Sequence, residues 1–337
     1  MVNQMGTEKL MARISQERWR RFVDEQRDVL VVYAILLGIV LLAYIFLPDF
    51  RGAGNFLNVL RQSVSLGIAS VGQTLVILVG GIDLSVGATI SLTNVYSSGF
   101  MANFTSPGLV VLMVIALLAV GLFIGFINAN VVTRLKVAPF IATMGVGAII
   151  QGLVLLYAKK PGGSITDAWA FFAAGRIGPI PFPVIFLAVL IAITWVLLNK
   201  TVWGQHLKAT GGSELIARLS GVETRQVTTY AYMLCSLMAA VTGMYLASRM
   251  GAGDPRVGGL QYERFDLDTI TAVLIGGTRL GGGKGGVIGT VAGVLIVSVL
   301  NNVFNLVGVN PYFQWIIKGS ILLAAVAVYS VRQNGRD

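Results

Sequence analysis

The chain is divided into long apolar runs separated by short polar segments, and this pattern leaves few possible folds. A helix needs about 20 mostly apolar residues to cross a bilayer. Such runs recur from residue 29 onward, and the whole chain is 55% hydrophobic and only 12% charged. In lipid, backbone polar groups must be hydrogen-bonded within the protein, so repeated apolar runs favour a helical bundle. The sequence therefore predicts an all-α, polytopic membrane protein.

Ten of these runs are predicted to be transmembrane helices, the third and the eighth being short or interrupted by glycine. They lie near residues 29–47, 58–79, 84–102, 108–130, 138–157, 182–198, 227–247, 268–280, 287–306 and 312–329. With an inner N-terminus, the inner segments hold about twice as many Lys and Arg residues as the outer ones, as expected of a cytoplasmic face. We therefore expect residues 1–28 and 331–337 to be cytoplasmic, flanking one transmembrane domain over residues 29–330. The net charge of +10 is spread between the apolar runs, which indicates membrane topology and no nucleic-acid partner.

Acidic residues are scarce inside the predicted spans. No Asp or Glu occurs between Asp83 and Asp167, or between Asp268 and Asp337. Ion-driven carriers usually hold a carboxylate in the membrane interior, so we expect the energy for transport to come from another subunit. His206 is the only histidine and there is one cysteine, which leaves no Ser-His-Asp triad, no HExxH zinc site and no cysteine metal cluster. The sequence predicts neither a catalytic nor a metal site.

Two glycine-rich turns, at residues 78–87 and 274–283, share a Gly-Gly pair, a Leu and a final Gly. Transporter folds are often built from internal repeats with Gly-interrupted helices, so the likeness suggests an internal repeat. The second turn has G-x-G-x-x-G spacing, but no acidic residue follows at the distance that a dinucleotide site requires, which favours a tight cytoplasmic turn. Asp83 and Arg279 either pair or flank one gate, or are two separately solvated residues. The candidate gate or turn residues are Gly80, Gly81, Asp83, Ser85, Gly276, Gly277, Arg279 and Lys284.

The predicted inner loop 199–226 contains the signal of a short helix. Ser213 can cap its start, Gly221 can close it, and Glu214 and Arg218 form a favourable i,i+4 pair. Gly211 and Gly212 are expected to break the chain before it. A helix this short needs support for its apolar face, either from the lipid interface or from a groove on a partner, and the residues alone favour neither. The apolar face consists of Leu215, Ile216 and Leu219.

Several amide side chains fall within the predicted spans. Hydrogen bonds between helices explain most of them, because a buried amide must find a partner. A neutral, hydroxyl-rich solute would need such groups along its path as well. The first candidates for that path are Asn301, Asn302 and Asn305, which cluster near one end of a span.

Residues 80–87, 209–222 and 275–285, followed in order by Asn301-Asn302, resemble the ribose-type permeases of bacterial ABC importers. The resemblance extends from about residue 55 to 329. It implies an inner-membrane subunit with about ten spans that acts as a dimer, a separate or fused ATPase that uses ATP and Mg, and a periplasmic sugar-binding protein. It implies no cofactor bound by this chain, and it makes the loop around Glu214 the segment that docks on the ATPase. At Leu215-Ile216 this family commonly has two Ala, so the docking face here is bulkier.

We accordingly expect the chain to move a monosaccharide into the cytoplasm and to catalyse no reaction. A carrier or channel that acts alone is the main alternative, and a membrane enzyme is a third. Within the family, pentoses, hexoses, inositol, furanone-type signals and nucleosides all stay open as cargo.

Overall fold

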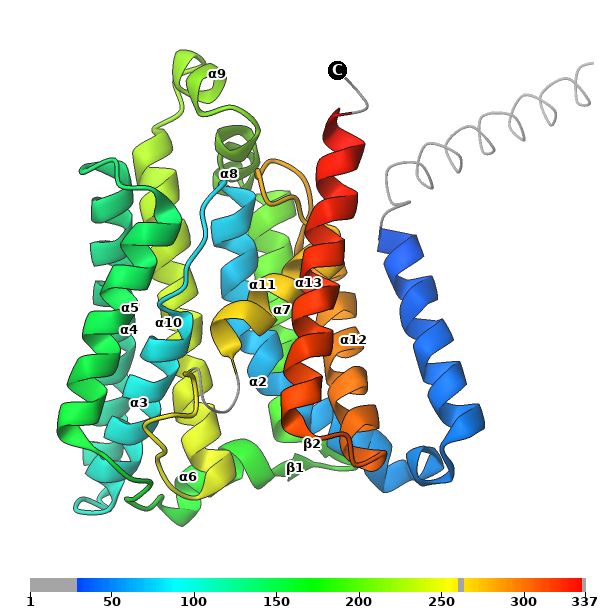
Figure 1. Ribbon diagram of the computed structural model, residues 1–337. Coiled ribbons are helices and arrows are strands. Elements are labelled where there is room, and N and C mark those ends of the chain that lie inside the picture. The colour runs from blue at the N-terminus through cyan, green and yellow to red at the C-terminus, as the bar shows by residue number, and fades with distance from the viewer. Residues whose placement is uncertain (1–28, 260–263, 335–337) are drawn as a thin grey trace, which may run out of the picture.

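The structure is a computed structural model, and it describes residues 29–259 and 264–334. Long helices dominate it and stand side by side in one bundle (Figure 1). The long helices are Val29–Phe46, α2 Ala53–Leu78, α3 Val86–Met101, α4 Pro107–Thr133, α5 Pro139–Tyr157, α7 Phe182–Lys200, α10 Thr224–Met250, α12 Val287–Leu306 and α13 Pro311–Asn334. The shorter elements are η1 Pro48–Arg51, α6 Asp167–Ala174, β1 Arg176–Ile177, β2 Ile180–Pro181, α8 Val202–Gly212, α9 Glu214–Leu219 and α11 Phe265–Ile275.

Six helices of the described ranges are long and apolar enough to cross a membrane: Val29–Phe46, α4, α5, α7, α10 and α12. This confirms the prediction of an all-helical, polytopic membrane protein, apart from the small β1–β2 hairpin. The helix Val29–Phe46 enters from the same end of the bundle at which α13 finishes, and α8 and α9 lie at that end too (Figure 1). The hairpin and α6 lie at the opposite end.

The helix α10 forms the centre of the bundle, packed against α2, α3 and α4. In the most apolar 18-residue stretch of α10, 72% is buried inside the protein, whereas in the helix Val29–Phe46 only 11% is buried. Close approach between α4 and α10 depends on Gly121 and Gly125, because a methyl group added at either would overlap the backbone or side chains of α10. Small residues at such a spacing let helices pack in lipid, where no hydrophobic force drives them together. Glycine therefore serves first as packing material, as its abundance suggests.

Two helices start in the middle of the bundle. The helix α3 follows the non-helical segment 81–85 and runs to one end of the bundle, whereas α11 runs to the other (Figure 1). The start of α3 meets the turn of residues 255–258 where Gly87 and Gly258 lie backbone to backbone, and the Gly258 amide donates to Ser91 Oγ at 3.0 Å. These are the two predicted spans that were short or interrupted by glycine. The helix α3 has 16 residues and α11 only 11, and the predicted span 268–280 is wrong after residue 275, where a turn replaces the helix.

Two predicted loops contain structure that the sequence did not indicate. The outer segment 158–181 folds into α6 and the β1–β2 hairpin. The predicted inner loop 199–226 contains the helix α8, whose last two residues are Gly211 and Gly212. The prediction that these glycines break the chain is therefore wrong. The helix α8 continues through both, and the break falls at Ser213, whose backbone is extended and which caps the start of α9.

Candidate functional site

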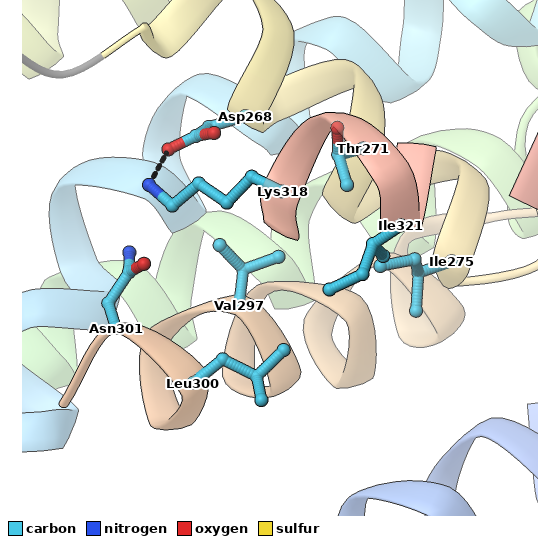
Figure 2. Close-up of a pocket in the computed structure, with 8 residues that line it drawn as sticks. All are labelled: Asp268, Thr271, Ile275, Val297, Leu300, Asn301, Lys318 and Ile321. Atoms are coloured by element: carbon cyan, nitrogen blue, oxygen red, sulfur yellow. Dashed lines mark hydrogen bonds and ion pairs between the residues drawn. The ribbon is translucent and has the colours of Figure 1, made fainter. Parts of the chain in front are cut away.

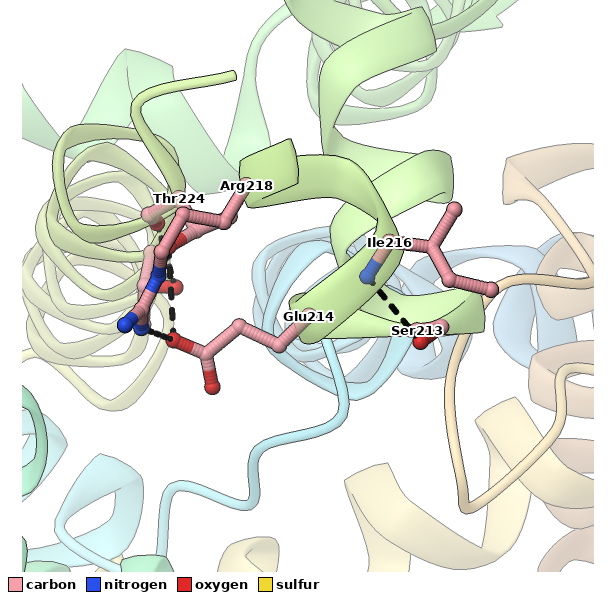
Figure 3. A network of polar contacts seen from close by, with 6 residues as sticks. Ser213, Glu214, Ile216, Arg218 and Thr224 are labelled. Atoms are coloured by element: carbon pink, nitrogen blue, oxygen red, sulfur yellow. Dashed lines mark hydrogen bonds and ion pairs between the residues drawn. The ribbon is translucent and has the colours of Figure 1, made fainter. Parts of the chain in front are cut away.

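The short helix predicted after Ser213 is present as α9 (Figure 3). Ser213 Oγ accepts a hydrogen bond from the Ile216 amide at 3.3 Å, which caps the helix start. Arg218 pairs with Glu214 Oε1 at 2.7 Å, and Thr224 Oγ1 donates to the same oxygen at 3.3 Å. These contacts tie α9 to the start of α10. A six-residue helix that is marginal alone is thus held in place by its cap and by its neighbour.

The apolar face of α9 has no partner among residues 29–259 and 264–334. Leu215, Ile216 and Leu219 are 67%, 65% and 80% exposed, whereas Ala217 is buried against the protein. The helix stands beside α8, at the end of the bundle where α13 finishes (Figure 1). Three large aliphatic side chains exposed together at a helix outside the spans are typical of a docking face.

The end of α8 touches both glycine-rich turns directly. A methyl group added at Gly211 would overlap the Leu78 carbonyl oxygen and lie 2.6 Å from the Gly283 nitrogen. That Gly283 amide donates a hydrogen bond to Leu78 O at 2.9 Å. A methyl group at Gly282 would lie 2.8 Å from the Gly80 nitrogen. We call this set the glycine junction, and it consists of Leu78, Gly80, Gly211, Gly282 and Gly283.

The glycine junction unites three segments that the sequence singled out separately. The turn after α2, the end of α8 and the turn between α11 and α12 meet backbone to backbone. Contacts between backbones have little freedom to adjust, so a displacement of α8 must be shared by both turns. The sequence predicted each segment but not their contact, because the three are far apart along the chain.

The likeness between the two turns reflects a shared helix ending. After α2 the Gly80 amide donates a hydrogen bond to Ile77 O, and the Gly81 amide donates one to Val76 O. After α11 the amides of Gly277 and Thr278 donate to the carbonyls three and five residues earlier in the same way. Gly80 and Gly277 both have positive φ, at 88° and 84°. The structural match is therefore shifted by one residue from the sequence match, which sets Gly80 against Gly276. The ends of α9 and α12 have the same hydrogen bonds at Gly221 and Gly308, so the internal repeat stays a prediction.

Asp83 lies in the interior and not at an exposed edge of the bundle. It is 0% exposed, and Ser85 donates to its Oδ1 from the amide at 2.8 Å and from Oγ at 2.6 Å. Asn128 and Ser236 add contacts at 3.4 Å each. This network fixes the extended segment between α2 and α3. The pairing of Asp83 with Arg279 stays a prediction; the Arg279 amide donates to the carbonyl of the exposed Lys284 at 2.9 Å within its own turn.

The structure separates the three asparagines predicted for the solute path. Asn302 is buried and exchanges two amide hydrogen bonds with Asn55, at 3.0 and 2.8 Å, which joins α12 to α2. Asn305 is exposed and accepts from Gln314 Nε2 at 3.3 Å. Asn301 alone lines a hollow, beside Asp268 and Lys318 (Figure 2). Asn302 thus has a structural partner, and Asn301 is the path candidate that the geometry favours.

The sequence did not identify the ion pair at this hollow. Lys318 Nζ of α13 donates to Asp268 Oδ2 of α11 at 2.8 Å. One signal was available, because Lys318 is a basic residue inside a predicted span, where an ionisable group needs a partner or a function. The two residues are 50 positions apart along the chain, so no local pattern indicates that they pair.

Comparison with known proteins gives a consistent result. Residues 55–326 match the family described as the permease component of branched-chain amino acid transport systems. The chain is 38% identical to the ribose import permease of Bacillus subtilis, over 96% of this chain and 98% of the relative. It is 34% identical to the galactose/methyl galactoside import permease of Haemophilus influenzae (91% and 95%) and 32% identical to the fructose import permease of Rhizobium meliloti (93% and 88%). No solved structure matches the chain.

Proposed function

This chain belongs to the permease family of ABC importers for branched-chain amino acids and sugars, and we propose that it carries a ribose-like monosaccharide from the periplasm to the cytoplasm. It is a multi-pass membrane subunit of a bacterial ABC sugar importer, and it is not an enzyme. Permeases of this kind bind no cofactor, and the ATP is bound by the ATPase partner. An ABC importer implies an ATPase and a binding protein. The observation that carries the choice of sugar is the 38% identity to a ribose permease over nearly the full length of both chains.

We propose ten crossings of the membrane, with both termini in the cytoplasm. The path of the chain supports this number, since the helix Val29–Phe46 starts and α13 ends on one side, and α3 and α11 both begin in the middle of the bundle (Figure 1). Each accounts for one crossing together with the chain before it, and discontinuous helices of this kind line solute paths in other transporters. The importer contains a second copy of this permease, so that two identical subunits enclose the path.

The face formed by Leu215, Ile216 and Leu219 docks in a groove of the ATPase. Its exposure outside the spans supports this role, because the helix is capped by Ser213 and the described part of the chain leaves the face uncovered. Movement of α9 reaches the bundle through α8 and the glycine junction, which contacts the ends of α2 and α11 at once. The gate residues Gly80 and Gly277 therefore shift together when the ATPase closes. In this way the ATPase changes the balance between the inward-open and outward-open states of the permease.

A carrier or channel acting alone is the competing function, and the galactose and fructose importers among the relatives supply alternative cargoes. Inositol, furanone-type signals and nucleosides stay open as well. Ion coupling is disfavoured because the two buried carboxylates near the predicted spans are both engaged within the protein: Asp268 by Lys318, and Asp83 by hydrogen bonds from Ser85.

The deciding experiment is uptake into liposomes that contain the purified chain. Labelled ribose, galactose and fructose are tested one at a time. We expect no uptake from the chain alone and ATP-dependent uptake of one sugar, ribose first, after the ATPase and the binding protein are added. Uptake driven by an ion gradient without those partners would refute the proposal.

A further inference from the structure

The ion pair between Asp268 and Lys318 lies inside the bundle, where charged side chains are costly. The two side chains are only 12% and 22% exposed, and they join the half-length helix α11 to α13. Ionisable groups at such depth either hold helices together or mark a path for a solute. The surroundings of the pair distinguish between these roles.

Two hollows adjoin the ion pair and share its residues. The first lies toward α12 and is lined by Asp268, Thr271, Ile275, Val297, Leu300, Asn301, Lys318 and Ile321 (Figure 2). The second lies between α11 and α13 and is lined by Arg264, Leu267, Asp268, Thr271, Trp315, Lys318, Gly319 and Leu322. Asp268, Thr271 and Lys318 line both hollows. The ion pair therefore lies between two hollows, of which the first has Asn301 as a further polar residue and the second has Arg264.

Each hollow also has a buried polar atom without a hydrogen-bond partner in the described chain. In the first it is the acceptor Asn301 Oδ1, and in the second it is the donor Arg264 Nε. An unsatisfied buried polar group costs about 1–3 kcal/mol, and such groups in native proteins usually have a reason. The ion pair that joins α11 to α13 satisfies neither atom.

We propose that Asp268, Lys318 and Asn301 form a contact site for the hydroxyl groups of the transported solute. This inference rests on the proposed transport of a monosaccharide. A sugar hydroxyl both donates and accepts, so one hydroxyl donates to Asn301 Oδ1 while others exchange with the Asp268 carboxylate and the Lys318 ammonium. The pair has no net charge, which suits a neutral polyhydroxylated solute better than an anion or a cation.

The place of the site in the fold fits a transient role. The helix α11 begins in the middle of the bundle, and such discontinuous helices contribute solute sites at this depth in other transporters. Few polar groups among aliphatic ones hold a sugar weakly, and weak binding lets the solute leave toward the cytoplasm. The binding protein supplies the affinity that this site lacks.

The test compares a sugar that the reconstituted importer carries with a deoxy analogue that lacks one hydroxyl. We expect Asn301→Ala to lower uptake of the parent sugar about fivefold, the effect of one lost hydrogen bond, and to reduce the preference for the parent over the analogue. The binding protein is the same in each assay, so its own preference cancels. The matched control is Asn103→Ala, an exposed asparagine just after the end of α3, which should leave uptake and preference unchanged. An unchanged preference with Asn301→Ala would overturn the inference.

The ion pair is tested by removing both charges together, because Asp268→Asn alone leaves a buried ammonium unpaired and endangers folding. The double variant Asp268→Leu, Lys318→Leu keeps the neutrality and bulk of the site, and we expect it to assemble with the ATPase and unfold at the wild-type temperature while uptake falls at least tenfold, roughly the loss of two hydrogen bonds. Wild-type uptake by this double variant would also overturn the inference. No ATP-dependent uptake of any sugar by the wild-type importer would instead count against the proposed function.

Discussion

Replacing Gly211 by alanine is expected to force α8 away from α2. The added methyl group would overlap the Leu78 carbonyl oxygen, and it would lie 2.6 Å from the Gly283 nitrogen that this carbonyl binds. An ordinary contact needs more than 3 Å, so the backbones must separate or the hydrogen bond must break. The neighbouring Gly212 is a matched control, because a methyl group there meets nothing within 4 Å.

The size of the effect follows from two opposing contributions. Overpacking of this kind costs about 1–3 kcal/mol, whereas alanine in a helix gains about 0.5–1 kcal/mol over glycine. Gly211→Ala should therefore lower the free energy of unfolding by about 1 kcal/mol, and Gly212→Ala should leave it unchanged or raise it slightly. Because the glycine junction is proposed to transmit ATPase closure, Gly211→Ala should also raise the number of ATP molecules hydrolysed per sugar imported.

Thermal unfolding of the purified permease measures the first effect. Paired assays of ATP hydrolysis and sugar uptake in liposomes measure the second. Equal behaviour of the two alanine variants in both assays would refute the backbone contact. A loss of stability in Gly211→Ala with unchanged coupling would preserve the contact but refute its role in transmission.

Three further predictions concern α9 and the bundle. Glu214→Lys removes the contacts to Arg218 and Thr224 and sets like charges at i,i+4, so ATPase association measured by co-purification should fall while membrane insertion persists; unchanged association would disprove the docking assignment. Ser213→Ala removes the cap, costs about 1 kcal/mol, and should weaken the same association less than Glu214→Lys does; equal or greater weakening would contradict this order. Gly125→Ala presses on the α10 backbone and should lower the unfolding temperature, whereas Gly152→Ala, with open space around it, should not; two equal temperatures would argue against the α4–α10 contact.

The sequence determined the class of protein because the bilayer imposes its length and polarity on every span. The position of most long helices and the cap at Ser213 also follow from local chemistry, since an apolar run or a hydroxyl before a short helix acts on its own neighbours. The order of the two glycine-rich turns and the loop around Glu214 was readable as motifs that resemble a known family, and their roles as gate and coupling segment stay predictions. The half-length of α11 was not readable, because its turn of residues 276–286 is set by contact with α8 and α2.

Only the tertiary structure decided which of these segments meet. It brought Gly211 onto Leu78 and Gly283, it joined Asn302 to Asn55, and it set Lys318 against Asp268. Each contact links residues that are distant along the chain, so no local pattern encodes it. Backbone approach, amide pairing and charge pairing all depend on how whole helices pack, and in lipid that packing is decided by the shape and hydrogen bonds of the assembled bundle.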